Sequence, residues 1–212
     1  MIQTSRIECP VILKWVGGKF EMSKRLIGMF PPHKNYVEPF FGGGSVFFRK
    51  KKSQCSVIND INRDLINLYM CIAKEETYDK FLKMCRMIPS SRGLFEYSDK
   101  IIKDEIKLED IGVDYERAAF YFYYMRSCFN GAVGAGFSIR KNTNPPWNDS
   151  CIEVVEYSRR KLDNCIVENM DVSDLVDRYI DLEDAFWYLD PPYVVADKEK
   201  YYEFNFNKDK HD

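Results

Sequence analysis

Short apolar runs alternate with amphipathic stretches toward both ends of the chain. Runs rich in β-branched and aromatic residues predict short strands at 35–40, 56–60, 165–169 and 185–190. The stretch 61–75 places four apolar residues on one helical face, Leu65, Leu68, Tyr69 and Ile72. Residues 171–180 are amphipathic in the same way. Strands that alternate with helices predict an α/β fold with a parallel sheet covered on both faces.

The glycine-rich turn after the first strand is followed by SVFFRKK, which predicts the start of a helix. The basic run RKKK, residues 49–52, is then interpreted as the solvated end of that helix.

The pattern changes between residues 74 and 150. A charged helical stretch leads to the aromatic run of residues 116–129, and a glycine-rich segment follows it. This region, 74–150, is predicted to be a mainly helical insertion into an α/β domain formed by 1–73 and 151–212. For residues 118–125 a buried aromatic helix is the better interpretation.

Composition and charge limit the class of protein. A chain of 212 residues with 45% hydrophobic content supplies a core for one domain with an insertion. The net charge of −2 argues against a broadly basic nucleic-acid coat, so a polyanion has to meet a local patch. The apolar runs are shorter than the roughly 20 residues of a membrane span, and the N-terminus lacks a signal region. We expect a cytoplasmic protein without a membrane partner.

Seven cysteines are scattered singly, without a C-x-x-C pair, and the chain has two histidines. This spacing favours buried reduced thiols and predicts no metal site.

Two glycine-rich turns and two acids supply candidate chemistry. EPFFGGGS, residues 38–45, could let the backbone approach a ligand, although a tight turn needs glycine for its own conformation. Asp60 ends the next strand, where it could accept hydrogen bonds from a ribose or cap the following helix. No Gly-Lys-Ser/Thr follows the glycines, so a nucleoside cofactor without a triphosphate fits better. In KWVGGK, residues 14–19, Lys19 could pair with a carboxylate.

DPPY, residues 190–193, ends the last predicted strand. The two prolines fix the backbone after Asp190, so its carboxylate and a main-chain carbonyl could hold an amine with two N–H donors. Tyr193 offers a flat face on which a base could stack. A proline-terminated strand with a capping Asp is the alternative.

KWVGGK, VEPFFGGGS, NDIN and DPPY, in this order, resemble the Dam-type DNA adenine-N6 methyltransferases, which use S-adenosylmethionine. The resemblance covers essentially the whole chain. It implies a Rossmann-like S-adenosylmethionine-dependent methyltransferase sheet, interrupted by an inserted DNA-recognition region, and double-stranded DNA as the partner. The implied mechanism is direct methyl transfer to an adenine flipped out of the duplex.

The resemblance also implies roles for individual residues. The implied catalytic residues are Asp190, Pro191, Pro192 and Tyr193. The implied cofactor-binding residues are Trp15, Gly17, Gly18, Lys19, Glu38, Pro39, Phe40, Gly42, Gly43, Gly44, Ser45, Asp60, Ile61, Asp171 and Asp190. Among these, Asp171 is a weaker candidate, for the adenine pocket.

Specificity is expected in the insertion. Residues 117–147 contain four cations and no acid, which gives the local positive patch that the whole chain lacks. The residues expected to contact DNA are Arg126, Asn130, Arg140 and Lys141.

Sheets of this family have seven strands in the order 3-2-1-4-5-7-6, and the sequence supplies strands for the first four. We therefore expect a C-terminally incomplete sheet. Three interpretations stay open: a fragment of a longer enzyme, half of a split enzyme completed by a C-terminal half or an oligomer partner, and an inactive remnant that binds without turnover.

Overall fold

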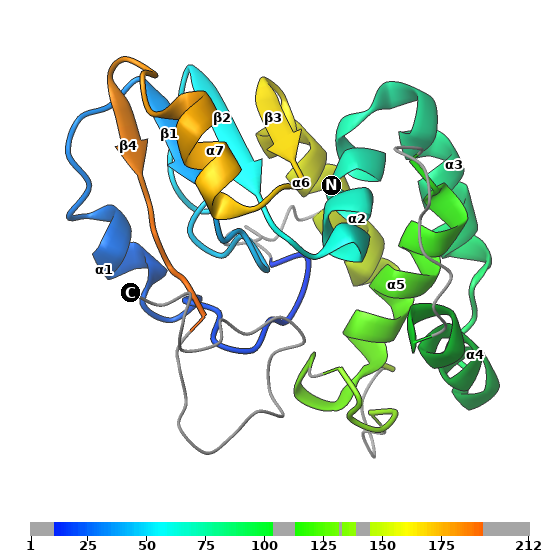
Figure 1. Cartoon of the computed structure of the whole chain (residues 1–212). Helices are drawn as coiled ribbons and strands as arrows, with labels where there is room; N and C mark the ends of the chain where they lie inside the picture. The colour runs from blue at the N-terminus through cyan, green and yellow to red at the C-terminus, as the bar shows by residue number, and fades with distance from the viewer. Residues whose placement is uncertain (1–10, 104–112, 132, 139–144, 193–212) are drawn as a thin grey trace, which may run out of the picture.

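A computed structural model describes residues 11–103, 113–131, 133–138 and 145–192 (Figure 1). Its strands form one parallel sheet in the order β3-β2-β1-β4. Their bounds are Asn35–Glu38 for β1, Cys55–Asn59 for β2, Cys165–Glu168 for β3 and Ala185–Trp187 for β4. The four predicted strands and the order 3-2-1-4 are confirmed. The expectation of an incomplete sheet depends on residues 193–212, which lie outside the described residues.

The register of the sheet brings the carboxyl ends of the strands together. Val37 of β1 is aligned with Val57 of β2 and with Trp187 of β4. Because all four strands are parallel, the loops that follow them leave from the same edge, at the lower side of the sheet in Figure 1. Ligands of open α/β sheets bind at this edge.

Helices cover the two faces of the sheet. Helix α7, Val172–Tyr179, lies in front of β1 and β2 in Figure 1. Its Leu175 is buried against Val37 and Val57 in a small apolar cluster. The other face belongs to the main core, which includes residues of α2 (Arg63–Ala73) and α6 (Asp149–Leu162). The apolar face predicted for α2 is buried as expected. Helix α6 and the short α1, Ser23–Ile27, were not predicted.

The helical region comprises α3 (Glu75–Met87), α4 (Arg92–Lys103), α5 (Tyr115–Ser127) and the 3-10 turn η1 (Phe129–Gly131). Helix α5 packs against α2, α3 and α4, and its aromatic run is buried, as predicted. One apolar cluster extends from Tyr36 and Ile58 of the sheet to Phe122 of α5. The helical region therefore shares the core of the sheet, and the domain boundaries stay a prediction. None of the helices among the described residues has the length and apolar character needed to cross a bilayer.

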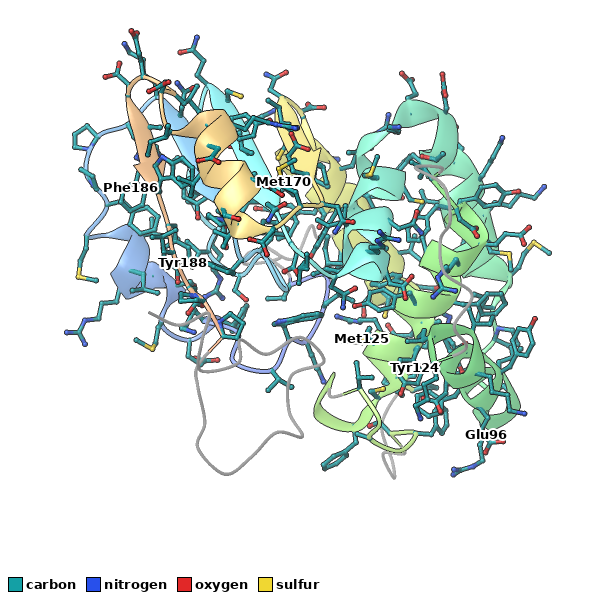
Figure 2. All side chains as sticks on the ribbon, in the orientation of Figure 1. Glu96, Tyr124, Met125, Met170, Phe186 and Tyr188 are labelled. Carbon is teal, nitrogen blue, oxygen red and sulfur yellow. The ribbon has the colours of Figure 1, made fainter. Side chains whose placement is uncertain are left out.

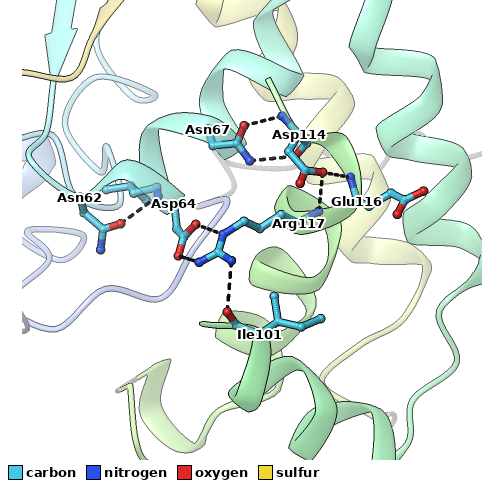
Figure 3. A network of polar contacts seen from close by, with 8 residues as sticks. Asn62, Asp64, Asn67, Ile101, Asp114, Glu116 and Arg117 are labelled. Atoms are coloured by element: carbon cyan, nitrogen blue, oxygen red, sulfur yellow. Dashed lines mark hydrogen bonds and ion pairs between the residues drawn. The ribbon is translucent and has the colours of Figure 1, made fainter. Parts of the chain in front are cut away.

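A polar network joins α2 to α5 (Figure 3). The Arg117 guanidinium donates to both carboxylate oxygens of Asp64, at 2.6 and 3.0 Å, and to the Ile101 carbonyl at 3.1 Å. The Asn67 side chain donates to the Asp114 carbonyl at 2.8 Å and accepts from the Asp114 N–H at 2.9 Å. A bidentate pair of this kind has a fixed geometry, so it sets the orientation of α5 relative to α2.

The segment after the glycine turn differs from the prediction. Residues 45–49 form turns and Lys50 a bend, where a helix was predicted. The Phe48 N–H donates to the Gly44 carbonyl at 3.0 Å and the Lys50 N–H to the Val46 carbonyl at 2.9 Å, but Arg49 bonds three residues back, to Val46 at 3.1 Å. The run of i to i−4 bonds that defines a helix is therefore interrupted. The interpretation of RKKK as a solvated face is wrong for Lys50, which is 3% exposed.

Candidate active site

A cavity of about 430 Å³ opens at the carboxyl edge of the sheet. It is lined by the loops after β1, β2, β3 and β4, by residues 15–19 and by the end of the helical region. Figure 2 labels three of the lining side chains, Met125 of α5, Met170 after β3 and Tyr188 after β4. Its volume lies within the range of small-molecule sites. The cavity includes both glycine turns and the start of DPPY, so the structure brings the separate motifs together.

Asp60 fastens the glycine turn to the end of β2. Its Oδ2 accepts the Gly42 N–H at 2.8 Å and its Oδ1 accepts the Asn62 N–H at 3.0 Å. Burial raises the pKa of the Asp60 carboxyl, and these N–H donors oppose the rise. The alternative prediction of Asp60 as helix cap is wrong, because Asn62 caps α2 by accepting the Leu65 N–H.

Trp15 packs directly on the glycine turn. A Cβ atom added to Gly42 would lie 2.8 Å from the Trp15 Nε1, and one added to Gly43 would lie 2.9 Å from the Trp15 Cβ. Gly42 also has a φ of +48°, which favours glycine. The Tyr69 hydroxyl donates to the Gly42 carbonyl at 3.0 Å. Both glycines are therefore required for the close approach of the N-terminal segment.

Lys19 and Asp190 form an ion pair between the first and last motifs. The Lys19 ammonium lies 2.8 Å from the Asp190 Oδ2, and the two side chains are 17% and 23% exposed. Lys19 also donates to the Gly17 carbonyl at 2.9 Å. The carboxylate that Lys19 pairs with in the structure thus belongs to the chain itself, and a role of Lys19 toward a ligand stays a prediction. Pro191 and Pro192 line the cavity beside Asp190, and Tyr193 lies outside the described residues.

Glu38 is a buried acid in the wall of the cavity. It is 3% exposed, and its Oε2 accepts the Tyr36 hydroxyl at 2.7 Å. Burial raises the pKa of Glu38 to about 8, which the Tyr36 hydrogen bond and the Lys50 charge oppose and the charges of Asp190 and Asp60 assist. Neither Tyr36 nor Lys50 could be recognised from the sequence, and Lys50 belongs to a run of cations that indicates a surface.

Asp171 and Asn59 position the loop after β3. The Asp171 carboxylate caps α7 by accepting the Ser173 N–H at 3.0 Å, and Asp171 also lines the cavity. The buried Asn59 side chain donates to the carbonyls of Pro39 at 3.0 Å and Met170 at 3.1 Å. Asn59 therefore links the loops after β1 and β3. Sequence reasoning missed it, although it begins the NDIN motif.

The four residues expected to contact DNA differ in where they lie. The Arg126 guanidinium donates to the carbonyls of Val11 and Ile12, each at 3.3 Å, and so supports the N-terminal segment. Asn130 belongs to η1, and its side chain is not described. Arg140 and Lys141 lie outside the described residues. Their contacts with DNA stay a prediction.

Comparison with known proteins shows which family the amino-acid sequence matches. The sequence model of the family described as D12 class N6 adenine-specific DNA methyltransferase matches residues 15–212. A Type II methyltransferase of Methanocaldococcus jannaschii is 26% identical over 229 residues, which cover 96% of this chain and 77% of the relative. The DNA adenine methylase of Serratia marcescens is 33% identical over 135 residues, which cover 64% of this chain and 47% of the relative. A DNA adenine methylase of Escherichia coli K12 is 32% identical over 138 residues, covering 64% of this chain and 46% of the relative.

Proposed function

Because the chain belongs to the D12 class of N6 adenine-specific DNA methyltransferases, we propose that its cavity binds S-adenosylmethionine and that Asp190 acts on the adenine amine. The chain is thus an enzyme that methylates N6 of adenine in DNA. The observation that carries the proposal is the Lys19–Asp190 pair at the cavity, because it joins the first motif to the last at 2.8 Å.

The cavity fits S-adenosylmethionine by size and by chemistry. A volume of about 430 Å³ suits a ligand of this size. Its wall contains four carboxyl side chains that could receive the ammonium and hydroxyl groups: Glu38, Asp60, Asp171 and Asp190. The glycines at 42 and 43 let Trp15, another residue of the cavity wall, pack directly on the turn. When bound, S-adenosylmethionine supplies a methyl group on a positively charged sulfonium.

Each acid has a distinct proposed task. Both Asp60 oxygens accept backbone N–H groups, and the proposed task of this carboxylate, which lines the cavity, is to accept a ribose hydroxyl. Asp171, fixed as the cap of α7, borders the adenine side of the cofactor. Glu38 meets the methionine end. The other motif residues of the wall act through backbone and apolar contact: Trp15, Gly17, Gly18, Pro39, Phe40, Gly42, Gly43, Gly44, Ser45 and Ile61.

Asp190 and the carbonyls of the two prolines are the proposed partners of the target amine. The adenine is flipped from the duplex, at a cost of a few kcal/mol, and stacks on Tyr193. Asp190 accepts one N6 hydrogen and a proline carbonyl accepts the other, which directs the nitrogen lone pair to the methyl group. The bound cofactor would supply the methyl group, and Asp190, which lines the cavity beside the two prolines, would accept the proton that N6 gives up. Lys19 holds the carboxylate in place beforehand.

The helical region 74–150 is the proposed target-recognition region. Arg126, Asn130, Arg140 and Lys141 are its proposed DNA contacts.

The role of Asp190 is tested by transfer of labelled methyl to duplex DNA at saturating cofactor and DNA. We expect Asp190→Asn to lower the rate by about 100-fold or more, because the amide cannot take the proton. Asp184→Asn is the matched control, since Asp184 also pairs with a lysine, Lys34, at 2.6 Å, at the start of β4 away from the cavity. Equal rates for the two variants would refute the role of Asp190.

A further inference from the structure

A line of buried ionisable side chains leads from the cavity into the core. Glu38 and Tyr36 are two residues apart on β1, so both side chains are on the same face of the sheet. The Tyr36 hydroxyl donates to the Glu38 Oε2 at 2.7 Å, and the Lys50 ammonium lies 4.1 Å from the centre of the Tyr36 ring. Lys50 donates further to the Ser53 Oγ at 2.7 Å. Glu38, Tyr36 and Lys50 are called the buried triad below.

The buried triad is costly to the fold. Burying an acid and an amine removes the hydration of both, and apolar residues of similar volume would pack there without that cost. Because burial disfavours the charged forms, it lowers the pKa of Lys50 to about 8 and raises the pKa of Glu38 to about 8. A group kept at such a cost is a candidate for a functional role.

Glu38 differs from the other acids of the cavity in its partners. Asp60 is engaged by two backbone N–H groups, Asp171 by the cap of α7, and Asp190 by Lys19. Within the described part of the chain, the hydrogen-bond donor to the Glu38 carboxyl is the Tyr36 hydroxyl, and it uses Oε2. Oε1 is therefore available for a donor in the cavity.

We propose that Tyr36 and Lys50 are positioning residues that prepare Glu38 for the α-ammonium of S-adenosylmethionine, and that Glu38 releases its proton to solvent when this cation binds. The inference rests on the proposed function of the cavity. The step is balanced: a neutral carboxyl and an ammonium become a carboxylate–ammonium pair, and one proton passes to the buffer. Tyr36 and Lys50 both favour the carboxylate, while the facing charges of Asp60 and Asp190 oppose it.

The inference makes cofactor affinity depend on pH. Because the carboxyl is protonated in the free protein at neutral pH, each rise in pH lowers the cost of losing that proton, and affinity increases. Loss of the Tyr36 hydroxyl removes a donor to the carboxylate, so Glu38 gives up its proton less readily.

Calorimetry on the whole chain tests the proposal. Binding of S-adenosylmethionine is measured at pH 6.5 in buffers of different ionisation enthalpy, where the α-amino group, with a pKa of about 7.7–8.0, is already protonated. We expect release of about one proton per cofactor bound. 5′-Methylthioadenosine lacks the α-ammonium and should bind without this release. Glu38→Gln should bind the full cofactor more weakly and without proton release.

The Tyr36→Phe variant removes the hydroxyl that donates to Glu38 and keeps the aromatic ring, so it tests the hydrogen bond apart from the packing. We expect weaker binding at pH 6.5 and a displacement of the affinity–pH curve to higher pH. Tyr179→Phe is the matched control, because the Tyr179 hydroxyl also donates to a glutamate, Glu168, at 2.6 Å, outside the cavity. This control should keep the wild-type proton count and pH curve.

Two results would overturn the inference in different ways. Cofactor binding without proton release and without pH dependence would refute the buried triad's role and leave the proposed function intact. An absence of cofactor binding at every pH would refute the proposed function and the inference with it.

Discussion

Gly44, in the turn after β1, is required both by its backbone conformation and by the side chains packed around it. Gly44 has a φ of +62°, and a Cβ atom there would lie 2.6 Å from the Phe41 Cζ and 2.7 Å from the Phe48 Cε2. Gly134 has a φ of +82° and no heavy atom within 4 Å of the same position. A side chain at either position would strain the backbone, but only a side chain at Gly44 would also clash with its neighbours.

We predict that Gly44→Ala destabilises the protein by about 1–3 kcal/mol more than Gly134→Ala, since only the first adds a clash to the strained φ. Urea unfolding of both variants measures the difference. Equal losses of unfolding free energy would mean that the phenylalanines rearrange without cost.

Some residue roles follow from the sequence and others do not. Asp60, Lys19 and Asp190 could be assigned to one site because their motifs end strands or glycine turns, and all three line one cavity. Lys50 could not, because its burial depends on the Tyr36 ring contributed by β1.

The ion pair between Asp64 of α2 and Arg117 of α5, called the clamp below, sets the position of the helical region relative to the cavity. The Arg117 and Asp64 side chains are 9% and 15% exposed. Helix α5 contributes Met125 to the cavity wall, and α2 begins just after Asp60. Loss of this ion pair would thus change the position of Met125 relative to Asp60 in the cavity wall.

Removing one partner of this pair should be expensive. We predict that Arg117→Met destabilises the protein by about 3 kcal/mol, because Asp64 is left with its charge and without its partner. Arg86→Met should cost below about 1 kcal/mol, since the Arg86–Glu156 pair spans 3.5 Å with side chains 59% and 48% exposed.

The unfolding free energies of wild type, Arg117→Met, Asp64→Asn and the double variant are measured in urea, together with that of Arg86→Met. A coupling energy near zero in this double-mutant cycle would show that the clamp does not stabilise the fold.

The strands and several helices could be predicted, whereas α6 and the turn after Gly44 could not. Hydrophobic runs and amphipathic faces are local properties, and they identified β1 to β4, α2 and α7. Residues 45–50 have a helical composition, but Val46, Phe47 and Phe48 are all buried. The Arg49 N–H bonds to the Val46 carbonyl instead of the Ser45 carbonyl, so the packing of these buried side chains overrides the local preference.

At the scale of the whole molecule, a parallel register places four strand ends at one edge, and this gathers distant motifs into one site. The same arrangement buries Glu38 in the cavity wall and Lys50 against the Tyr36 ring. Both groups then link folding stability to pH.

The raised pKa of Glu38 and the lowered pKa of Lys50 change the unfolding free energy with pH in opposite directions. The pKa of Glu38 rises from 4.5 to about 8, so its contribution to stability is complete below pH 4.5 and is lost as the pH rises through 8. The pKa of Lys50 falls from 10.5 to about 8, so its contribution is present above pH 10.5 and is lost as the pH falls through 8. Together they predict a minimum of stability near pH 8.

We predict that Glu38→Gln abolishes the loss of stability between pH 5.5 and pH 8, because the amide does not titrate. The measurement is the difference in unfolding free energy between wild type and variant at the two pH values. Glu153→Gln, an exposed substitution on α6, should leave the wild-type trend in place. A difference for Glu38→Gln that does not vary with pH would contradict the assignment.

The most direct test of the central claim identifies the methylated atom. Duplex DNA is incubated with the protein and S-adenosylmethionine that carries a deuterated methyl group, and the digested nucleosides are analysed by mass spectrometry. We expect deuterated methyl on N6-methyladenine, with the signal lost in Asp190→Asn and kept in Asp184→Asn. Label on cytosine, or label on adenine that persists in Asp190→Asn, would contradict it.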